Sequence, residues 1–315
     1  MGKVMRVVLV GGSGFIGKKL IDRLLQAHCE LTVLSRTPNK VKNSFRAVHA
    51  ELWDTKTNNA LHDVLDGADA VINLTGESIA SKRWTRMQKQ RILSSRMEST
   101  QALIGAMKQM KRKPAVLLNA SAVGYYGHVP EGEVTETRAK GNGFLADVCA
   151  VWEAEALKAQ DFGIRVVLLR TGIVINKTGG ALQKLLLPFR LFLGGPLGSG
   201  AQWFPWIHLQ DEVSGILFAM ENEHMSGPVN LAAPESVRMS EFCKVLGGIL
   251  HRPSWIKVPS RALHLVLGEM AGPLLLEGQN MIPQKLIASG FKFQFPKLED
   301  ALKDLLSEEV YETEF

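Results

Sequence analysis

Cysteine is scarce in this sequence, with only Cys29, Cys149 and Cys243 in a chain of 315 residues. The three lie far apart, so the spacing predicts neither a disulfide framework nor a metal site built from paired cysteines. We therefore expect no metal ion. A reducing cytoplasmic location fits this cysteine usage best.

Long hydrophobic runs are also lacking. The most apolar later stretches, 185–195 and 263–276, are interrupted by charged residues, glycine or proline, and fall short of the roughly 20 residues that a membrane-spanning helix needs. The net charge of +6 is modest, and basic residues are not interleaved with aromatic ones as in nucleic-acid-binding surfaces. We expect no membrane and no nucleic acid as partner, and a monomer or homodimer that takes a small-molecule substrate.

A cluster of glycines, by contrast, lies near the start of the chain. Residues 6–17 read RVVLVGGSGFIG, a short apolar run without alternation, as in a strand buried on both faces, followed by Gly11, Gly12, Gly14 and Gly17. The next residues, 18–27, have apolar positions at helical spacing. Strand, glycine turn and helix N-terminus together suit a pyrophosphate, because glycines let the backbone approach and the first amides of the helix face the anion.

The end of the second apolar stretch, 31–34, carries Ser35 and Arg36. In a Rossmann-type fold this position meets the adenosine ribose, where an acidic residue would bind the ribose hydroxyls. An arginine instead offers donors that suit a 2′-phosphate. The sequence therefore favours NADP over NAD.

Strand-like and helix-like stretches alternate through the first half of the chain, which predicts a Rossmann-type doubly wound parallel sheet in an α/β fold. Further strands are expected at 45–52, 68–74, 116–120 and 164–169. Residues 83–110 read as a long helix with Arg91 and Arg96, either of which could reach a phosphate or a substrate. We assign residues 1–175 to the cofactor-binding domain.

After residue 175 the pattern changes. Residues 176–306 are expected to form a smaller α+β domain on the substrate side, with strands shared across the boundary, and residues 307–315 an acidic, frayed tail. Residues 179–211 read as a long irregular segment rich in glycine and proline. Loops of this length are usually functional, so we predict that Trp203, Phe204, Trp206 and His208 line a pocket over the cofactor.

Candidate catalytic residues follow the expected strand at 116–120. Ser121 could hydrogen-bond a substrate oxygen, and Tyr125 or Tyr126 could supply a phenolic proton, although aromatic packing explains at least one of the two equally well. Glu153 and His208 are further candidates for a proton relay.

Several motifs are specific enough to carry a resemblance: GGSGFIG, NLTGE, NASAVGYYG, WEAEA, GGPLGSGAQWFPWIH and PQKLIASGFKF. With them the chain resembles the extended short-chain dehydrogenase/reductase superfamily, and within it the atypical epimerase-family proteins sometimes labelled cell-division inhibitors. The resemblance covers nearly the whole chain and implies NADP(H) binding. The cofactor-binding residues that it implies are Gly11, Ser13, Gly14, Phe15, Ile16, Ser35, Arg36, Leu74, Thr75, Gly76, Arg91 and Arg96.

One feature of the wider superfamily is missing. Its active members use a tyrosine with a lysine four residues later, in which the ammonium lowers the pKa of the phenol. The tyrosines of this chain are Tyr125, Tyr126 and Tyr311, and none has a lysine at that spacing. Two interpretations stay open: an NADP(H)-dependent oxidoreductase or nucleotide-sugar-epimerase-like enzyme, or a catalytically inactive NADP(H)-binding sensor or interaction protein.

Overall fold

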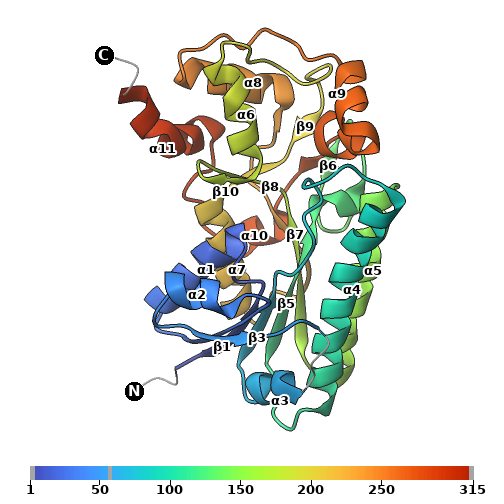
Figure 1. Ribbon diagram of the computed structural model, residues 1–315, viewed down its shortest axis with the longest axis vertical. Helices are drawn as coiled ribbons and strands as arrows, with labels where there is room; N and C mark the ends of the chain where they lie inside the picture. The colour runs from blue at the N-terminus through green and yellow to red at the C-terminus, as the bar shows by residue number, and fades with distance from the viewer. Residues whose placement is uncertain (1–3, 56–58, 312–315) are drawn as a thin grey trace.

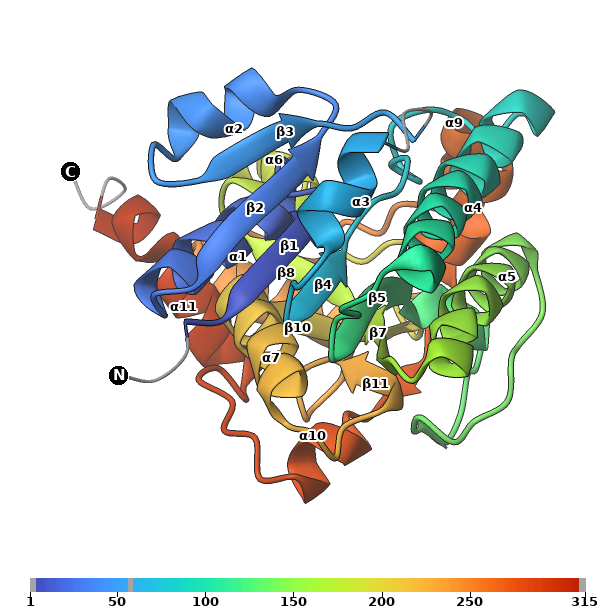
Figure 2. The same cartoon turned by 90° about the horizontal axis from the view of Figure 1, so that it is seen from below.

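A parallel sheet of seven strands forms the centre of the molecule, in the order β11-β7-β5-β4-β1-β2-β3 (Figures 1 and 2). The computed structural model describes residues 4–55 and 59–311. In chain order the strands are β1 (Arg6–Val10), β2 (Glu30–Ser35), β3 (His49–Leu52), β4 (Ala70–Asn73), β5 (Val116–Ala122), β7 (Arg165–Thr171) and β11 (Gly227–Leu231). The Rossmann-like fold predicted from the sequence is confirmed.

Helices cover both faces of this sheet (Figure 2). One face carries α1 (Phe15–Gln26) and α7 (Leu209–Glu221), and the other carries α3 (Asn59–Leu65), α4 (Arg86–Gln109) and α5 (Phe144–Leu157), while α2 (Pro38–Ser44) lies beside β3. Short 3₁₀ helices follow β5 (η1, Val123–Tyr126) and α5 (η2, Lys158–Phe162).

The apolar run of β1 is explained by these two layers. Val7 and Leu9 belong to the hydrophobic core under α1 and α7, whereas Val8 and Val10 belong to the core under α3, α4 and α5. Because successive strand residues point to opposite faces, a strand between two helical layers needs apolar side chains at every position.

The C-terminal elements lie beyond the carboxyl ends of the sheet strands, at the top of Figure 1. Their core is built around Phe189, Trp206 and Phe242. The helices are α6 (Gly180–Arg190), α8 (Met239–Ile249), α9 (Ser260–Leu267) and α11 (Leu298–Tyr311), with a 3₁₀ turn η3 (Gly268–Met270) and a π turn η4 (Gly272–Leu276). Helix α10 (Gln284–Ala288) lies instead beside β11, and its buried Leu286 belongs to the core under α1 and α7. Three two-stranded sheets complete this part: β10 (Trp206–His208) with β8 (Ile173–Asn176), β12 (Val237–Arg238) with β9 (Trp203–Phe204), and β13 (Asn280–Met281) with β6 (Glu133–Val134).

The two halves are interwoven. β11 pairs in parallel with β7 and forms one edge of the central sheet, although it comes after residue 175. Helix α7, also from the later half, packs its buried Val213 and Ile216 in the same core as Leu20 and Leu24 of α1. The later half therefore completes both the sheet and one of its cores.

Several expectations need correction. The third strand begins at His49 and not at residue 45. Helix α6 occupies part of the segment expected to be irregular, because buried Leu182, Leu186 and Phe189 anchor one face of it despite Gly180 and Pro188. The tail is helical as far as Tyr311, and residues 312–315 lie outside the described part of the chain.

In the described residues, no helix is both long and apolar enough to cross a membrane. Within the same residues, no group of three or more histidine, cysteine, aspartate or glutamate side chains could hold a metal ion.

Candidate functional site

The glycine turn after β1 brings three backbone segments together. Gly11 has a φ of +87°, and a Cβ there would lie 2.9 Å from the carbonyl carbon of Leu74 at the end of β4. A Cβ on Gly17 would lie 2.7 Å from the carbonyl oxygen of Gly11. Glycine is therefore required where the turn, β4 and α1 meet.

Helix α1 begins at this turn without a side-chain cap and without an acidic residue in its first turn. Its N-cap is Gly14, which is exposed together with Ser13. The first amides of the helix therefore face the carboxyl edge of the sheet with no carboxylate of their own, which is the arrangement that binds a pyrophosphate. This turn fits the cofactor expected there.

At the end of β2, Ser35 and Arg36 differ in their surroundings. Ser35 is buried, and its Oγ accepts a hydrogen bond of 3.1 Å from the Thr37 amide. Arg36 is exposed next to it. Ser35 therefore shapes the turn, and the guanidinium of Arg36 is accessible to a ligand phosphate.

After β4, Thr75 Oγ1 lies 2.5 Å from Asn73 Oδ1 and 2.7 Å from Ser99 Oγ. Gly76 leaves space for Arg96, since a Cβ there would lie 2.9 Å from its guanidinium carbon. Arg96 Nη1 donates to the carbonyls of Glu77 and Ile92, and burial lowers the pKa of Arg96. Arg91 and Arg96 of α4 were both predicted from the sequence to reach a phosphate or a substrate. Arg96 lines a cavity at the carboxyl edge of the sheet, whereas Arg91 is exposed.

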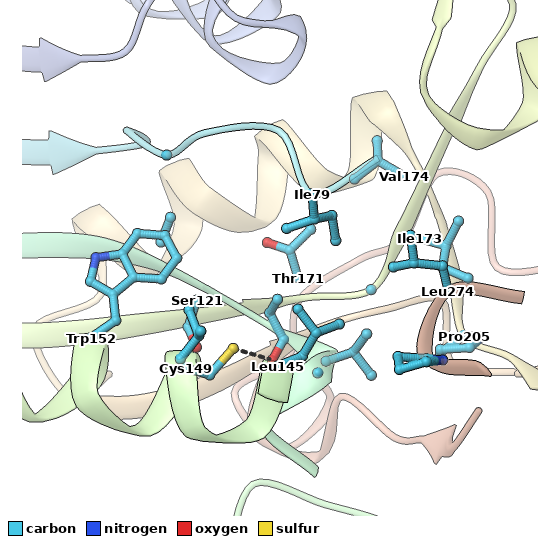
Figure 3. Close-up of a pocket in the computed structure, with 18 of the residues that line it drawn as sticks. Ile79, Ser121, Leu145, Cys149, Trp152, Thr171, Ile173, Val174, Pro205 and Leu274 are labelled. Atoms are coloured by element: carbon cyan, nitrogen blue, oxygen red, sulfur yellow. Dashed lines mark hydrogen bonds between the residues drawn. The ribbon is translucent and has the colours of Figure 1, made fainter. Parts of the chain in front are cut away.

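A cavity of about 400 Å³ lies between the carboxyl ends of the strands and the C-terminal elements (Figure 3). It reaches from the glycine turn to β8, the strand that follows β7 in the chain, since Ile16 of α1 and Ile173 of β8 both line it. Its other apolar wall residues are Leu74, Ile79, Ala120, Ala122, Val123, Leu145, Val148, Trp152, Val174, Pro205, Pro273 and Leu274. The polar side chains in the wall are Thr75, Arg96, Ser121, Cys149, Thr171, Glu212, Glu277 and Gln279.

Helix α5 presents Leu145, Val148, Cys149 and Trp152 to this cavity, and Leu145 and Cys149 lie below its centre in Figure 3. The pairs Leu145 with Cys149 and Val148 with Trp152 each have the four-residue spacing of the tyrosine and lysine in active superfamily members. Burial raises the pKa of the Cys149 thiol to about 11, and its Sγ lies 3.9 Å from the Ala122 carbonyl. This helix face therefore offers neither a phenol nor an ammonium group.

Ser121 lies within β5, opposite Arg170 of β7, and not in the loop after it. Its Oγ donates a 2.6 Å hydrogen bond to Glu153 Oε1. Arg170 donates to both oxygens of Glu153, at 2.9 Å and 2.8 Å. The Glu153 carboxylate is thus buried and fully engaged, and we assign it a positioning function for Ser121 instead of the proton relay considered from the sequence.

The two tyrosines also have partners outside the cavity wall. Tyr126 is 1% exposed, donates a 2.6 Å bond to Asn230 Oδ1 and accepts one of 3.0 Å from Arg170 Nη1. Burial raises its pKa to about 12. The guanidinium carbon of Arg170 lies 3.5 Å from the ring centre of Tyr125. The geometry therefore favours aromatic packing for both, and not the catalytic acid that the sequence suggested.

The aromatic segment 203–208 was predicted to cover the cofactor, and this placement is wrong. Phe204 and Trp206 are buried in the C-terminal core, and Trp203 stacks on Arg238. His208 is 1% exposed, packs on Phe295 and accepts a hydrogen bond from the Gln210 amide. Burial lowers the pKa of His208 to about 4. From this segment the cavity wall takes Pro205, because the apolar rings are buried in the core.

Glu212 is a wall residue that belongs to none of the sequence motifs. It lies in the first turn of α7, is 0% exposed, and its Oε1 accepts a 2.8 Å hydrogen bond from Thr171 Oγ1. Burial raises its pKa to about 8. Helical spacing could have revealed it, because Glu212 is three residues after Leu209 and four before Ile216, both buried.

Comparisons with known proteins agree with this geometry. Residues 7–232 match the NAD dependent epimerase/dehydratase family, and residues 258–305 match a domain of unknown function, DUF1731. The Arabidopsis thaliana protein named "Epimerase family protein SDR39U1 homolog, chloroplastic" is 39% identical over 96% of this chain and 87% of its own length. The "Epimerase family protein SAR0825" of Staphylococcus aureus is 38% identical over 95% of this chain and 98% of its own length.

Among solved structures, human epimerase family protein SDR39U1 (isoform 2), crystallised with NADPH, has a TM-score of 0.85 and 35% identity over 96% of this chain and 99% of that chain. A nucleoside-diphosphate sugar epimerase from Corynebacterium glutamicum has a TM-score of 0.77 and 28% identity, and the match covers 97% of this chain and 59% of that one. This chain belongs to the NAD dependent epimerase/dehydratase family, in agreement with the resemblance seen in its sequence.

Proposed function

We propose that this protein binds NADP(H) along the carboxyl edge of its sheet and is an oxidoreductase or epimerase-like enzyme acting on a small carbonyl or sugar-like substrate. The observation that carries the proposal is the continuous wall from the glycine turn at Ile16, past Thr75 and Gly76, to Ser121 and Thr171. In open α/β sheets, ligands bind at this edge. The human relative crystallised with NADPH supports the choice of cofactor.

In this proposal, the amides that open α1 hold the pyrophosphate and Arg36 binds the 2′-phosphate of the adenosine ribose. Arg96 is the one cation among the described residues of the cavity wall, so it is suited to the nicotinamide half of the cofactor or to a substrate oxygen. The bound cofactor supplies hydride transfer. The largely aliphatic inner wall excludes water and favours a substrate whose reacting end is apolar.

A second, wider hollow of about 930 Å³ shares Gly124, Leu145, Pro273, Glu277 and Gln279 with the cavity. His128, Arg138, Lys140 and His264 also line this hollow, whose acidic residues are Glu269 and Glu277. We assign it to the remainder of the substrate. The two cations and two carboxylates of this hollow balance each other, and its polar side chains favour a substrate with a polar group away from the reacting carbon.

Arg36→Ala tests the cofactor assignment. Losing a charge-assisted contact to the 2′-phosphate should weaken NADPH binding by roughly 10-fold or more, while NADH binding changes less than about 2-fold. The matched control is Arg46→Ala, which removes an exposed arginine before β3, at the amino edge of the sheet. Fluorescence titration with both cofactors measures the effect, and equal losses for NADPH and NADH would contradict the assignment.

An inactive NADP(H)-binding sensor or interaction protein is the second candidate, and Leu145 and Cys149 on the cavity face of α5 favour it. Screening carbonyl compounds for NADPH oxidation separates the two. Intact NADPH binding with no turnover across aldehydes, ketones and nucleotide sugars would support the sensor, and turnover with any of them would support the enzyme.

A further inference from the structure

The carboxyl group of Glu212 is only half satisfied. Its Oε1 accepts the hydrogen bond from Thr171, but its Oε2 is buried and has no hydrogen-bond partner within the part of the chain that the structure describes. Buried polar atoms in folded proteins are nearly always paired. Both Glu212 and Thr171 line the cavity, so a bound ligand is the group best placed to pair with Oε2.

Two charged neighbours of Glu212 are engaged with other groups. Asp211 accepts hydrogen bonds from the amides of Gln294 and Phe295, and Arg170 is paired with Glu153. The titratable and charged side chains on the elements packed around Glu212 are Asp211 and Glu221 on α7, Lys18, Lys19, Asp22 and Arg23 on α1, Arg165 and Arg170 on β7, His208 on β10, Lys285 on α10, and Arg96, Cys149 and Glu277 across the cavity.

Burial raises the pKa of Glu212 and the Thr171 hydrogen bond lowers it, with a result of about 8. The carboxyl is therefore protonated at neutral pH, and loses its proton only slightly above it. A group with such a pKa can both donate and accept a proton under working conditions.

We propose that Glu212 exchanges the proton that accompanies hydride transfer, in place of the missing tyrosine; this inference rests on the proposed function. In the reducing direction, the substrate carbonyl carbon would accept a hydride from bound NADPH, which would become NADP⁺. The carbonyl oxygen takes the proton from Glu212 Oε2, so the carboxyl O–H bond breaks and the O–H bond of the alcohol forms. A proton from the solvent returns to the carboxylate once the product has left the cavity. Oxidation runs through the same exchange in reverse.

A test without substrate uses the charge of the nicotinamide ring, which is positive in NADP⁺ and neutral in NADPH. A carboxylate beside the ring favours NADP⁺, and a neutral carboxyl removes that preference. The Kd of NADP⁺ divided by that of NADPH should therefore fall about 10-fold between about pH 6 and about pH 9 in the wild-type protein. Protonation of the 2′-phosphate affects both cofactors alike and cancels in this ratio.

In Glu212→Gln, the ratio should change less than about 2-fold over the same range, because the amide cannot titrate. Glu221→Gln is the matched control. It removes an exposed carboxyl from the same helix, α7, outside the cavity, and it should keep the wild-type pH dependence. Melting temperatures establish that each variant is folded.

Thr171→Val gives a second, independent test, in which the midpoint of the pH dependence of the Kd ratio is measured. It removes the hydrogen bond that lowers the pKa of Glu212, so the midpoint of the pH dependence should move to higher pH. An unchanged midpoint would overturn the inference.

The outcomes separate the two proposals. If the wild-type protein binds neither cofactor, the proposed function fails and this inference fails with it. If it binds both with a ratio that does not depend on pH, or if Glu212→Gln keeps the dependence, the function of Glu212 is disproved and cofactor binding stands.

Discussion

Two buried carboxyl groups, Glu153 on α5 and Glu212 on α7, lie on opposite faces of the central sheet. Each carboxyl accepts a hydrogen bond from one of two successive residues of β7. Arg170 donates to Glu153, and Thr171 donates to Glu212. Because neighbouring strand residues point to opposite faces, one short stretch of sequence supplies a cation to one carboxyl and a hydroxyl to the other.

The comparison shows that the partner and not the degree of burial decides what a buried carboxyl can do. Glu153 is 5% exposed and Glu212 is 0% exposed, so their burial is nearly the same. A guanidinium that binds both oxygens stabilises the ionised form, whereas one neutral hydroxyl leaves the cost of burying a charge largely uncompensated. Glu153 is therefore suited to holding structure, and Glu212 to moving a proton.

Breaking the charged pair should have the largest effect. Arg170→Met leaves the Glu153 carboxylate buried without its cation, and should lower the free energy of unfolding by about 3–5 kcal/mol. Urea denaturation measures the loss. The double variant Glu153→Gln, Arg170→Met should recover part of it, because no unpaired charge then remains. A double variant no more stable than Arg170→Met would show that packing, and not charge, is responsible.

The pH dependence of stability should distinguish the second carboxyl. The folded pKa of Glu212, about 8, lies above its ordinary value of 4.5, so the folded state holds a proton that the unfolded state releases between these values. Stability conferred by the protonated carboxyl is therefore lost as pH rises through this window, by at most about 1.4 kcal/mol per pH unit. Glu212→Gln should lack this loss. Urea denaturation at several pH values measures the free energy of unfolding of the wild-type protein and of Glu212→Gln. The same pH dependence in both proteins would contradict this prediction.

The smallest expected effect is the difference in stability cost between removing the hydroxyl of Ser121 and removing that of Thr171. Ser121→Ala removes a hydrogen bond to an ionised acceptor and should cost about 1.5–3 kcal/mol, whereas Thr171→Val removes one to a neutral acceptor and should cost about 1 kcal/mol at neutral pH. Above about pH 9 the cost of Thr171→Val should approach that of Ser121→Ala, because Glu212 is then ionised. Equal costs at neutral pH would remove the distinction between the two carboxyls.

Much of the fold could be predicted from sequence because its signals are local. An apolar run such as Val7 to Val10 and the glycines after it specify a buried strand and a turn without reference to distant residues. Helix α6 was missed, because its glycine and proline argue against a helix and its stability comes from contacts of Leu186 and Phe189 with the C-terminal core. Propensity is overridden by tertiary packing in such a segment.

The residues of the site also fall into two groups, those predicted from the local sequence and those whose positions depend on distant contacts. The glycine turn and Arg36 lie next to recognisable strands, so their placement followed from the pattern. Whether Tyr126, His208 or Glu212 meets the cavity depends on packing between segments distant in sequence. Tyr126 pairs with Asn230, and His208 packs on Phe295. The tyrosines were predicted to be catalytic from their chemical type alone. Glu212 was not, because glutamate is common in the first turn of a helix.

The pairing of β11 with β7 has a consequence for synthesis of the chain on the ribosome. Until residue 231 has emerged, β7 has an open edge on the side where β11 pairs, and α1 lacks the cover of α7. Nascent chains with unpaired strand edges and uncovered apolar faces are prone to aggregate. We therefore expect a product truncated near residue 175 to be insoluble, and chaperone demand during translation to last until the edge strand is in place.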